Sequence, residues 1–167
     1  MERGDRKEIF VSAPIQKMRA VIQRVSQASV SISGQIKGQI SKGLLVLVCV
    51  APNDTPEDVD WLAGKVARMR IFSDEKGLMN LALSDVDGQI LVVSQFTLFA
   101  STKKGNRPGY TGAALPAVAI PLYEAFVRKL EELTGKPIPT GEFGADMQVS
   151  LINDGPVTIW MDTHNKE

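Results

Sequence analysis

The residues best suited to chemistry stand together at the end of an apolar stretch. Residues 91–93 are Leu-Val-Val, a pattern typical of a buried strand, and Ser94, Gln95, Phe96 and Thr97 follow directly. In one interpretation the hydroxyls of Ser94 and Thr97 cap the strand end by bonding nearby backbone, and residue types alone favour it. In the other, the two hydroxyls, the Gln95 amide and free backbone N–H groups face a cleft from a rigid strand end. Both interpretations stay open at this point.

Three further segments combine turn residues with groups that could bind a ligand. Residues 153–158, Asn-Asp-Gly-Pro-Val-Thr, join two predicted strands and have the composition of an ordinary turn. Residues 143–147 indicate a tight turn that leads into a strand. Residues 103–110 form a basic loop that could hold a phosphate backbone and stack a base, although such a loop is more often only solvated surface. Its basic and aromatic residues are Lys103, Lys104, Arg107 and Tyr110.

The scarcity of histidine and cysteine excludes several classes of site. The one histidine, His164, stands in a polar stretch close to the last residue of the sequence, so a buried Ser-His-Asp or Cys-His arrangement is not expected. Zinc sites of the His/Cys type are excluded for the same reason, and no carboxylate cluster has a spacing that suits another metal. Glycine-rich phosphate loops are absent as well. We expect no metal and no cofactor; an enzyme with these residues performs mild chemistry or borrows groups from its substrate.

Composition predicts one ordinary globular domain. The 167 residues are 44% hydrophobic and 23% charged, which is enough for one real core. The 19 basic residues equal the 19 acidic ones, so contact with RNA requires a local patch. The single cysteine, Cys49, lies in an apolar run and is expected to pack in the core of a cytoplasmic protein. No apolar stretch approaches the roughly 20 residues that span a bilayer, so no membrane contact is expected.

The periodicity of the chain predicts many strands and two principal helices. Strands are expected over 19–25 and 28–33, with a turn at Gly34, and over 44–50, 89–98, 147–152 and 157–161. Thr55 and Pro56 predict a helix that runs to about residue 70, and a second helix is expected from about 116 to 133. Pro121 should lie in the first turn of that second helix or mark its true start. The fold class is therefore α/β, with layered, mainly antiparallel mixed sheets and both helices packed on one side.

Two of these segments, in this order, resemble the D-aminoacyl-tRNA deacylase family. They are the Ser-Gln-Phe-Thr-Leu motif at 94–98 and the Asn-x-Gly-Pro-Val-Thr motif at 153–158. The similarity covers nearly all of 18–162, a deacylase domain preceded by an extension at 1–17 and followed by a polar tail at 163–167. It extends to segments 22–25, 70–74, 79–81 and 143–149.

The resemblance implies a homodimeric hydrolase with its active sites at the subunit interface. Such an enzyme hydrolyses the ester between a D-amino acid, or glycine, and the 3′-terminal adenosine of tRNA, and rejects L-aminoacyl-tRNA. In the family, the peptide that corresponds to Gly155-Pro156 is cis and enters the pocket of the partner subunit. There its carbonyl oxygens face the α-amino group, so that an L side chain would meet the wall. Asn153 belongs to this selection group, and Arg24 is expected to support the Gly-Pro loop of the other subunit.

The resemblance also assigns roles around the first motif. Backbone N–H groups of Phe96 and Thr97 would stabilise the oxyanion, while the ribose 2′-hydroxyl of the tRNA assists attack by water. Ser94 and Gln95 would orient the substrate, and Thr97 ranks as a positioning group ahead of a nucleophile, because no activating base is visible. By analogy, Phe143 and Met147 line the adenine pocket. A noncatalytic RNA-binding module that uses the basic loop is the alternative function, and a serine esterase is nearly excluded by the histidine content.

Overall fold

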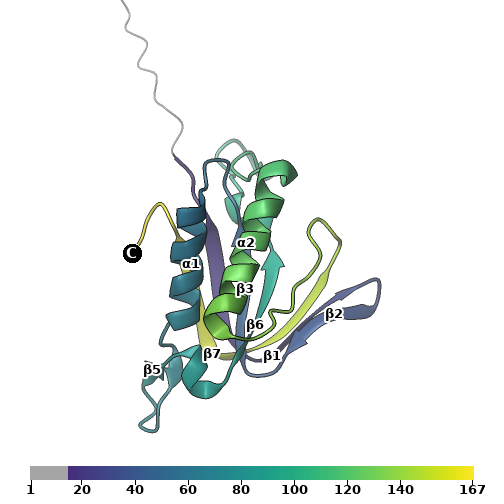
Figure 1. The fold of residues 1–167 in the computed structure, drawn as a ribbon. Helices are drawn as coiled ribbons and strands as arrows, with labels where there is room; N and C mark the ends of the chain where they lie inside the picture. The colour runs from purple at the N-terminus through teal and green to yellow at the C-terminus, as the bar shows by residue number, and fades with distance from the viewer. Residues whose placement is uncertain (1–14) are drawn as a thin grey trace, which may run out of the picture.

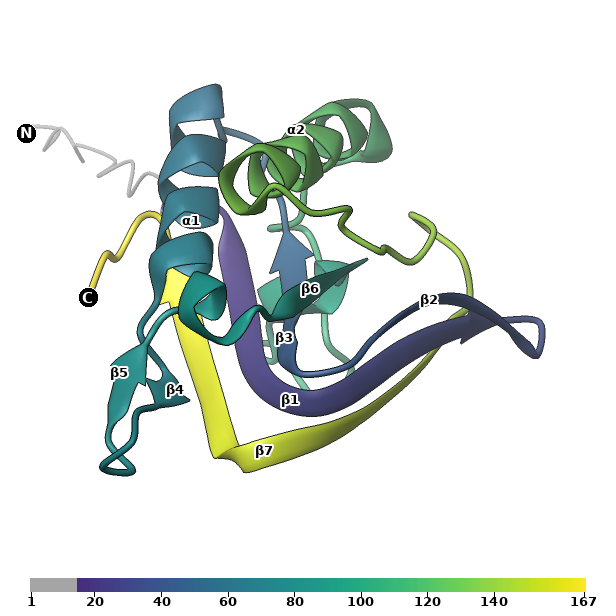
Figure 2. The same cartoon turned by 60° about the horizontal axis from the view of Figure 1, so that its bottom comes forward.

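A curled five-stranded sheet organises the chain, and two helices cover one of its faces. The computed structural model describes residues 15–167. Figures 1 and 2 show α1 and α2 side by side on the same side of β3 and β6, with β1 and β7 bending together away from them. The strands are β1 (Arg19–Ile32), β2 (Gln35–Ile40), β3 (Gly43–Cys49), β4 (Phe72–Ser73), β5 (Met79–Leu81), β6 (Gln89–Ser94) and β7 (Gln148–Asp162). The helices are α1 (Pro56–Arg68) and α2 (Pro116–Thr134), with short 3₁₀ turns at η1 (Leu83–Val86) and η2 (Phe96–Phe99).

Strand β1 is the hub of the sheet. Its first half pairs with β3 from Arg19 opposite Cys49 to Val25 opposite Gly43, and its second half pairs with β2. The opposite edge of β1 pairs with β7 along both halves. All of these pairings are antiparallel, and only β3 with β6 is parallel among the described strand pairs. The expected fold class, mainly antiparallel with helices on one side, is confirmed.

Strand β3 is buried on both faces, as its continuous apolar sequence predicts. Leu44, Val46 and Val48 contact the core beneath the helices, which also contains Leu62 of α1 and Phe126 of α2. The opposite face of the sheet belongs to a second core, formed as β1, β2 and β7 curl over it. This second core contains Val25, Ala28, Val30, Ile40, Leu45, Leu91 and Val93.

Both helices begin where their sequence signals predict. Thr55 precedes α1, and its backbone N–H donates to Asp58 Oδ2 at 2.9 Å, which closes a capping box. Helix α2 begins at Pro116 and ends at Gly135, whose positive φ of 67° permits the terminal bond to Glu131 O. The expectation for Pro121 is wrong: it lies inside α2, beyond the first turn. Because proline has no N–H, the Ala117 carbonyl loses one intrahelical donor there while the helix continues.

Three strand boundaries also differ from the sequence prediction. The strands expected over 19–25 and 28–33 are one continuous strand, β1. Strand β6 ends at Ser94 instead of continuing to residue 98, because the chain turns into η2. The two strands predicted around 153–158 are one strand, β7, whose halves both pair with β1 in the same direction. The register jumps from Thr158 opposite Gln23 to Asn153 opposite Val25, so the intervening residues form a bulge and not a reversing turn.

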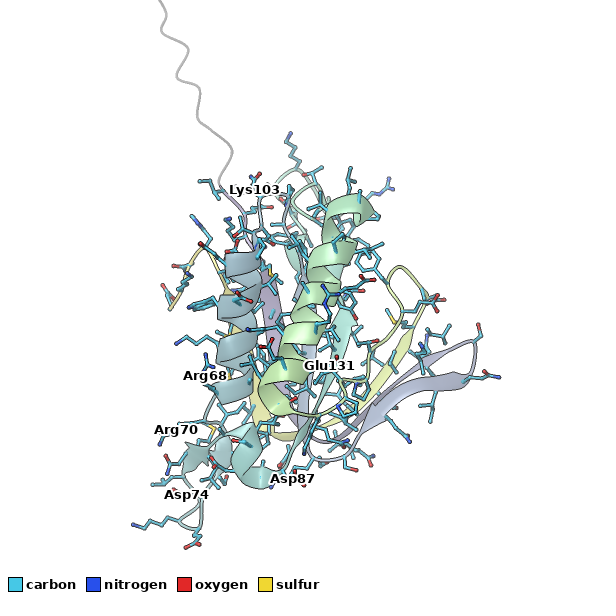
Figure 3. The ribbon with its side chains drawn as sticks, in the orientation of Figure 1. Arg68, Arg70, Asp74, Asp87, Lys103 and Glu131 are labelled. Carbon is cyan, nitrogen blue, oxygen red and sulfur yellow. The ribbon has the colours of Figure 1, made fainter. Side chains whose placement is uncertain are left out.

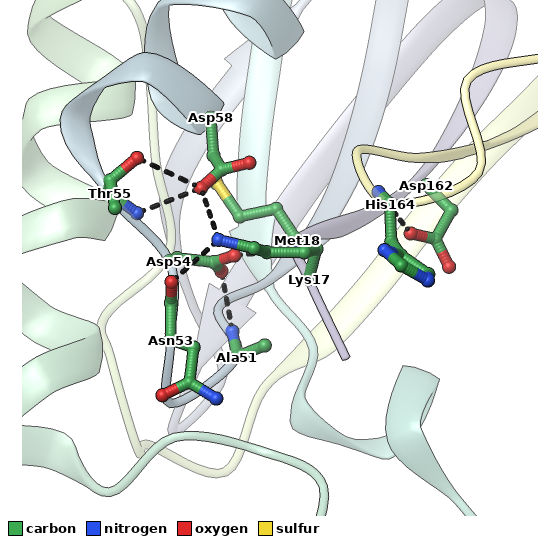
Figure 4. Close-up of polar contacts among 9 residues, drawn as sticks. All are labelled: Lys17, Met18, Ala51, Asn53, Asp54, Thr55, Asp58, Asp162 and His164. Atoms are coloured by element: carbon green, nitrogen blue, oxygen red, sulfur yellow. Dashed lines mark hydrogen bonds and ion pairs between the residues drawn. The ribbon is translucent and has the colours of Figure 1, made fainter. Parts of the chain in front are cut away.

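A polar cluster ties the start of β1 to the loop after β3 (Figure 4). Asp54 accepts hydrogen bonds from the backbone N–H of Met18 at 2.8 Å and of Ala51 at 2.6 Å. Burial nevertheless raises the pKa of Asp54 to about 6. Burial also acts to raise the pKa of neighbouring Asp58, but hydrogen bonds from the Thr55 N–H and from Lys17 lower it. The two carboxyl groups therefore titrate in opposite directions from their ordinary values.

The raised pKa of Asp54 predicts a pH dependence of stability. Between about pH 4 and pH 6 the unfolded chain has lost the Asp54 proton while the folded chain still holds it. The free energy of unfolding should therefore fall as pH rises through this window, by on the order of 1 kcal/mol for a carboxyl group that water partly screens. Denaturant titrations at several pH values in this range give the free energy of unfolding at each pH. This free energy should change less with pH in Asp54→Asn than in the unmodified chain, and Asp60→Asn on the exposed face of α1 serves as the control. Equal slopes for Asp54→Asn and the unmodified chain would contradict the assignment.

Candidate active site

A cavity of about 250 Å³ opens at the end of the sheet where β3 and β6 terminate. The beginning of α2 forms one wall, and the 143–149 segment forms the facing wall. Five of the residues predicted from the sequence line it: Ser94, Gln95, Phe96, Phe143 and Met147. The other lining residues are Val48, Cys49, Val50, Val93, Ala114, Ala119, Tyr123, Gly144, Ala145 and Val149. None of these side chains is a carboxylate, a lysine, an arginine or a histidine, so shape and neutral polar groups define the cavity.

Backbone hydrogen bonds hold the first motif at the cavity edge. The Gln95 N–H donates to Val48 O at 2.8 Å, which extends the parallel pairing by one residue beyond β6. The η2 turn then closes with a bond of 3.2 Å from Leu98 N to Gln95 O. The N–H groups of Phe96 and Thr97 precede that first bond and are therefore not used within the turn. The motif thus presents backbone donors at a rigid strand end.

Thr97 is adjacent to the cavity but is not among its lining residues. Its hydroxyl accepts a hydrogen bond from the Gln95 amide nitrogen. No titratable side chain hydrogen-bonds to that hydroxyl in the part of the chain that the structure describes. The contact positions Gln95 and Thr97 relative to one another and supplies no base for a nucleophilic threonine.

The far wall contains the predicted adenine-binding pair and an aromatic neighbour. The ring of Phe143 lies against Tyr123 of α2, with 5.9 Å between ring centroids. A Cβ atom at Gly141 would lie 2.3 Å from the Met147 sulfur, so a larger residue there would shift the Met147 side chain from its present position. Phe143, Met147 and Tyr123 together form an apolar surface on which a flat heterocycle can stack.

Tyr123 and Cys49 are cavity residues that the sequence prediction missed. Tyr123 stands at helical spacing with Phe126 and Leu130, so the sequence indicated a core residue and nothing more. Only 7% of Tyr123 is exposed, and burial raises its pKa to about 12 although the Thr140 side chain acts to lower it. Burial likewise raises the pKa of Cys49 to about 12. Both groups stay neutral near pH 7 and can take part in hydrogen bonding but not in ionic chemistry.

The second motif lies on the bulge of β7, and its Gly155–Pro156 peptide bond is cis. The Asn153 side chain spans the bulge: its Oδ1 accepts from Val157 N at 2.8 Å and its Nδ2 donates to Val157 O at 3.1 Å. Arg24 Nε donates to Asp154 O at 2.7 Å, and its Nη1 donates to Ile71 O at 2.7 Å. Arg24 therefore holds the bulge of its own chain, while Gly155 and Pro156 remain exposed.

A single chain does not bring its two motifs together. Asn153 lies opposite Val25, which in turn lies opposite Gly43 at the start of β3. The cavity lies at the other end of β3, beyond Val48, so the two sites are separated by about five residues, or roughly 17 Å along the strand. Arg24, Asn153, Gly155 and Pro156 line no part of the cavity.

The basic loop predicted at 103–110 lies beside the cavity mouth. Lys103, Lys104 and Arg107 are exposed. The ring of Tyr110 meets the ring of Phe96 edge to face, with centroids 5.1 Å apart. The loop is therefore next to the first motif, although it does not line the cavity.

Comparison with known proteins decides the family. A family model described as D-Tyr-tRNA(Tyr) deacylase matches residues 21–162. The chain belongs to this family. A relative in Flavobacterium johnsoniae, named D-aminoacyl-tRNA deacylase, is 63% identical over 150 residues that cover 90% of this chain and 100% of the relative. A protein of the same name in Chromobacterium violaceum is 54% identical with the same coverage.

Solved structures agree with the family in fold. The structure titled "c-Myc DNA Unwinding Element Binding Protein" matches with a TM-score of 0.80 and 37% identity, covering 86% of this chain and 97% of that one. A structure of a probable eukaryotic D-amino acid tRNA deacylase matches with a TM-score of 0.76, over 87% of this chain and 98% of that one. At 17% identity this second structure supports the fold alone.

Residues 15–167 show neither a cluster suited to a metal ion nor a membrane-spanning helix. No group of three or more histidine, cysteine, aspartate or glutamate residues in that range could hold a metal ion. Neither described helix is long and apolar enough to cross a bilayer.

The environment of Cys49 predicts an inert thiol. With its pKa near 12, only on the order of one thiol in ten thousand is ionised at about pH 8, and the side chain is buried. Alkylation of the folded protein should be slow, and complete labelling should require denaturant. Cys49→Ala should retain ester hydrolysis within a few-fold. Rapid labelling of the folded protein, or a folded but inactive Cys49→Ala variant, would overturn this prediction.

Proposed function

We propose that this chain hydrolyses the ester bond of D-aminoacyl-tRNA, and of glycyl-tRNA, and spares L-aminoacyl-tRNA. The observation that carries the proposal is the uncharged cavity, in which the Ser94–Phe96 strand end faces Phe143 and Met147. The family to which the chain belongs supplies the reaction class. In this proposal the terminal adenine stacks between Phe143 and Met147, and the ester carbonyl lies at the N–H groups of Phe96 and Thr97.

The proposed mechanism relies on positioning and on the reactivity of the ester. Water adds to the ester carbonyl, the two N–H groups stabilise the oxyanion, and the ribose 3′-oxygen leaves with a proton. The neighbouring ribose 2′-hydroxyl assists the attack, which fits a cavity with no histidine or carboxylate among its lining residues. Ser94 and Gln95 orient the substrate, and the Gln95–Thr97 contact makes Thr97 a positioning residue.

Chiral selection is proposed to act across a homodimer interface. The exposed Gly155–Pro156 bulge of one subunit enters the cavity of the other, where its carbonyl oxygens bind the α-ammonium group of the substrate. The separation of the two motifs within one chain supports this arrangement, because the bulge does not reach the cavity of its own subunit. With the ammonium group fixed, an L side chain collides with the wall, and hydrogen or a D side chain points outward.

Arg24 and Asn153 are proposed to shape the bulge and not to contact the ester. Their bonds to Asp154 O and to both polar groups of Val157 define the path of the backbone on either side of Gly155-Pro156. A contact of Arg24 with the bulge of the other subunit, as expected from the family, remains a prediction.

The proposal also includes a cytoplasmic location and a functional core over 18–162, flanked by an accessory segment at 1–17 and a tail at 163–167. Cys49 is the one cysteine in the sequence, so no intrachain disulfide can form. This supports a reducing compartment such as the cytoplasm. Residues 1–14 of the accessory segment lie outside the described residues. A purely noncatalytic RNA-binding module is not favoured, because the named relatives are deacylases.

Purified protein should release amino acid from D-tyrosyl-tRNA at least about 100-fold faster than from L-tyrosyl-tRNA. This rate ratio corresponds to a difference in activation free energy of about 2.7 kcal/mol.

The Thr97→Ala variant should keep measurable activity, because Thr97 positions the substrate and does not attack the ester. Rates follow from loss of labelled amino acid from tRNA precipitated at intervals. Equal rates for the two substrates would refute the proposal, and complete inactivity of a folded Thr97→Ala variant would favour a threonine nucleophile.

Mixed dimers test whether the filter works across the interface. A Cβ at Gly155 would lie 2.5 Å from Val157 N, so Gly155→Val displaces the bulge and should remove chiral selection. Ala114→Trp should block the cavity, which Ala114 lines. Co-expressed at equal levels, the two variants should recover about a quarter of the selective activity, because half of the dimers contain one complete site of two. No recovery, with heterodimers verified by differential tags, would place both motifs in one subunit.

A further inference from the structure

We propose that residues 101–110, called the basic hairpin below, bind the phosphate backbone of an RNA whose 3′ end occupies the cavity. The inference rests on the proposed function and adds to it a surface by which the enzyme would distinguish an aminoacyl ester on RNA from the same ester on a free nucleoside. The groups involved are Lys103, Lys104 and Arg107.

The basic hairpin is a defined structure and not a loose tail. Ser101 and Gly109 exchange two backbone hydrogen bonds, of 2.8 Å from Ser101 N to Gly109 O and of 2.9 Å in the reverse direction. Beyond it, Ala113 N donates to Tyr110 O at 3.1 Å and Ala114 N donates to Val50 O at 2.9 Å. The hairpin is thus tied to the residue that follows β3 and to a residue that lines the cavity, so its cations have a fixed position relative to the site.

In sequence, the hairpin and the residues on either side of it carry charge of one sign only. From residue 88 to residue 123 the chain contains no aspartate or glutamate, and Lys103, Lys104 and Arg107 are its only charged residues. All three side chains are exposed, and none of the ion pairs formed within residues 15–167 involves them. In a chain with no net charge, three exposed cations without acidic neighbours in sequence make a local positive surface.

The hairpin lies where an RNA must leave the cavity. The edge-to-face contact between Tyr110 and Phe96 joins it to the first motif, and both rings are exposed, by 37% and 57%. The facing wall carries the opposite charge, with Glu142 and Asp146 exposed on either side of Phe143. A polyanion whose terminal nucleoside is stacked on that wall is therefore repelled on the acidic side and attracted toward the hairpin.

The hairpin and two cations that have acceptors lie at opposite ends of the described residues. Figure 3 shows Lys103 at the end of the molecule that also holds the beginning of α1 and α2, whereas Arg70, Asp74 and Asp87 lie at the opposite end. At that opposite end two of the cations have acceptors: Lys136 pairs with Asp87 at 2.6 Å, and Arg70 donates to Asn80 O at 2.7 Å. We assign phosphate binding to the hairpin end because the hairpin contacts the first motif through Tyr110 and Phe96.

The test compares two substrates with one set of variants. The triple variant Lys103→Gln, Lys104→Gln, Arg107→Gln should lose about 10- to 100-fold in kcat/KM on D-tyrosyl-tRNA. The slope of log KM against log salt concentration should also be smaller by about two than for the unmodified protein. On the D-tyrosyl ester of adenosine it should stay within two-fold of the unmodified protein. The matched control Lys42→Gln, Lys65→Gln, Lys76→Gln removes the same charge from exposed residues away from the hairpin and should leave both activities unchanged.

Each contrary result overturns the inference. Equal losses on both substrates would mean that the hairpin shapes the cavity, and an unchanged rate on tRNA would mean that the RNA follows another path. Dissociation of the dimer by the triple variant, measured by sedimentation, would make the hairpin a subunit contact. If the unmodified protein cleaves neither ester, the proposed function fails by itself, and anisotropy with labelled uncharged tRNA still tests the hairpin: equal affinity of the unmodified and triple-variant proteins would refute it.

Discussion

Strand β3 must be covered on both faces, and the architecture follows from that requirement. Helices α1 and α2 cover Leu44, Val46 and Val48, while the opposite face is closed by the curl of β1, β2 and β7. Strand β1 takes part in both halves of the fold. It pairs with β3 and then with β2 along one edge, and with β7 along the other edge. The hydrophobic effect thus imposes the bend in β1, and the bend determines where both motifs lie.

The cavity and the bulge are two consequences of this curl. Where β3 and β6 end, the space between the beginning of α2 and the 143–149 segment stays open as the cavity. Where β1 and β7 bend together, β7 carries extra residues that have no partners on β1, and these form the bulge at 154–157, which is exposed from Asp154 to Pro156. Because the two positions are at opposite ends of β3, a single chain keeps its polar motif and its Gly-Pro segment apart.

The sequence predicted local features well and long-range ones poorly. The β3 strand, the capping box at Thr55 and the beginning of α2 depend on neighbouring residues, and the structure agrees with each. The end of β6 at Ser94 depends on a hydrogen bond from Gln95 N to Val48 O, and residue types cannot reveal that bond. Two apparent strands proved to be β7 alone, because only the pairing with β1 distinguishes a bulge from a hairpin turn. Tyr123 looked like a core residue because helical spacing identifies the buried face of a helix. Spacing does not reveal whether that face borders a cavity.

The absence of charge from the cavity lining explains how shape could govern both chemistry and selectivity. The nucleophilic and phenolic groups present, Cys49 and Tyr123, have raised pKa values that keep them neutral, so they cannot act as ionic catalysts. A substrate ammonium group in such a cavity finds no carboxylate and needs dipolar oxygen atoms instead, which the carbonyl groups of a projecting backbone segment can offer. An acid in the wall would bind the ammonium of either enantiomer from several directions, whereas fixed carbonyl groups define one direction. In the proposed dimer, a neutral site that the other chain completes is therefore better suited to reject L side chains than a site with its own carboxylate.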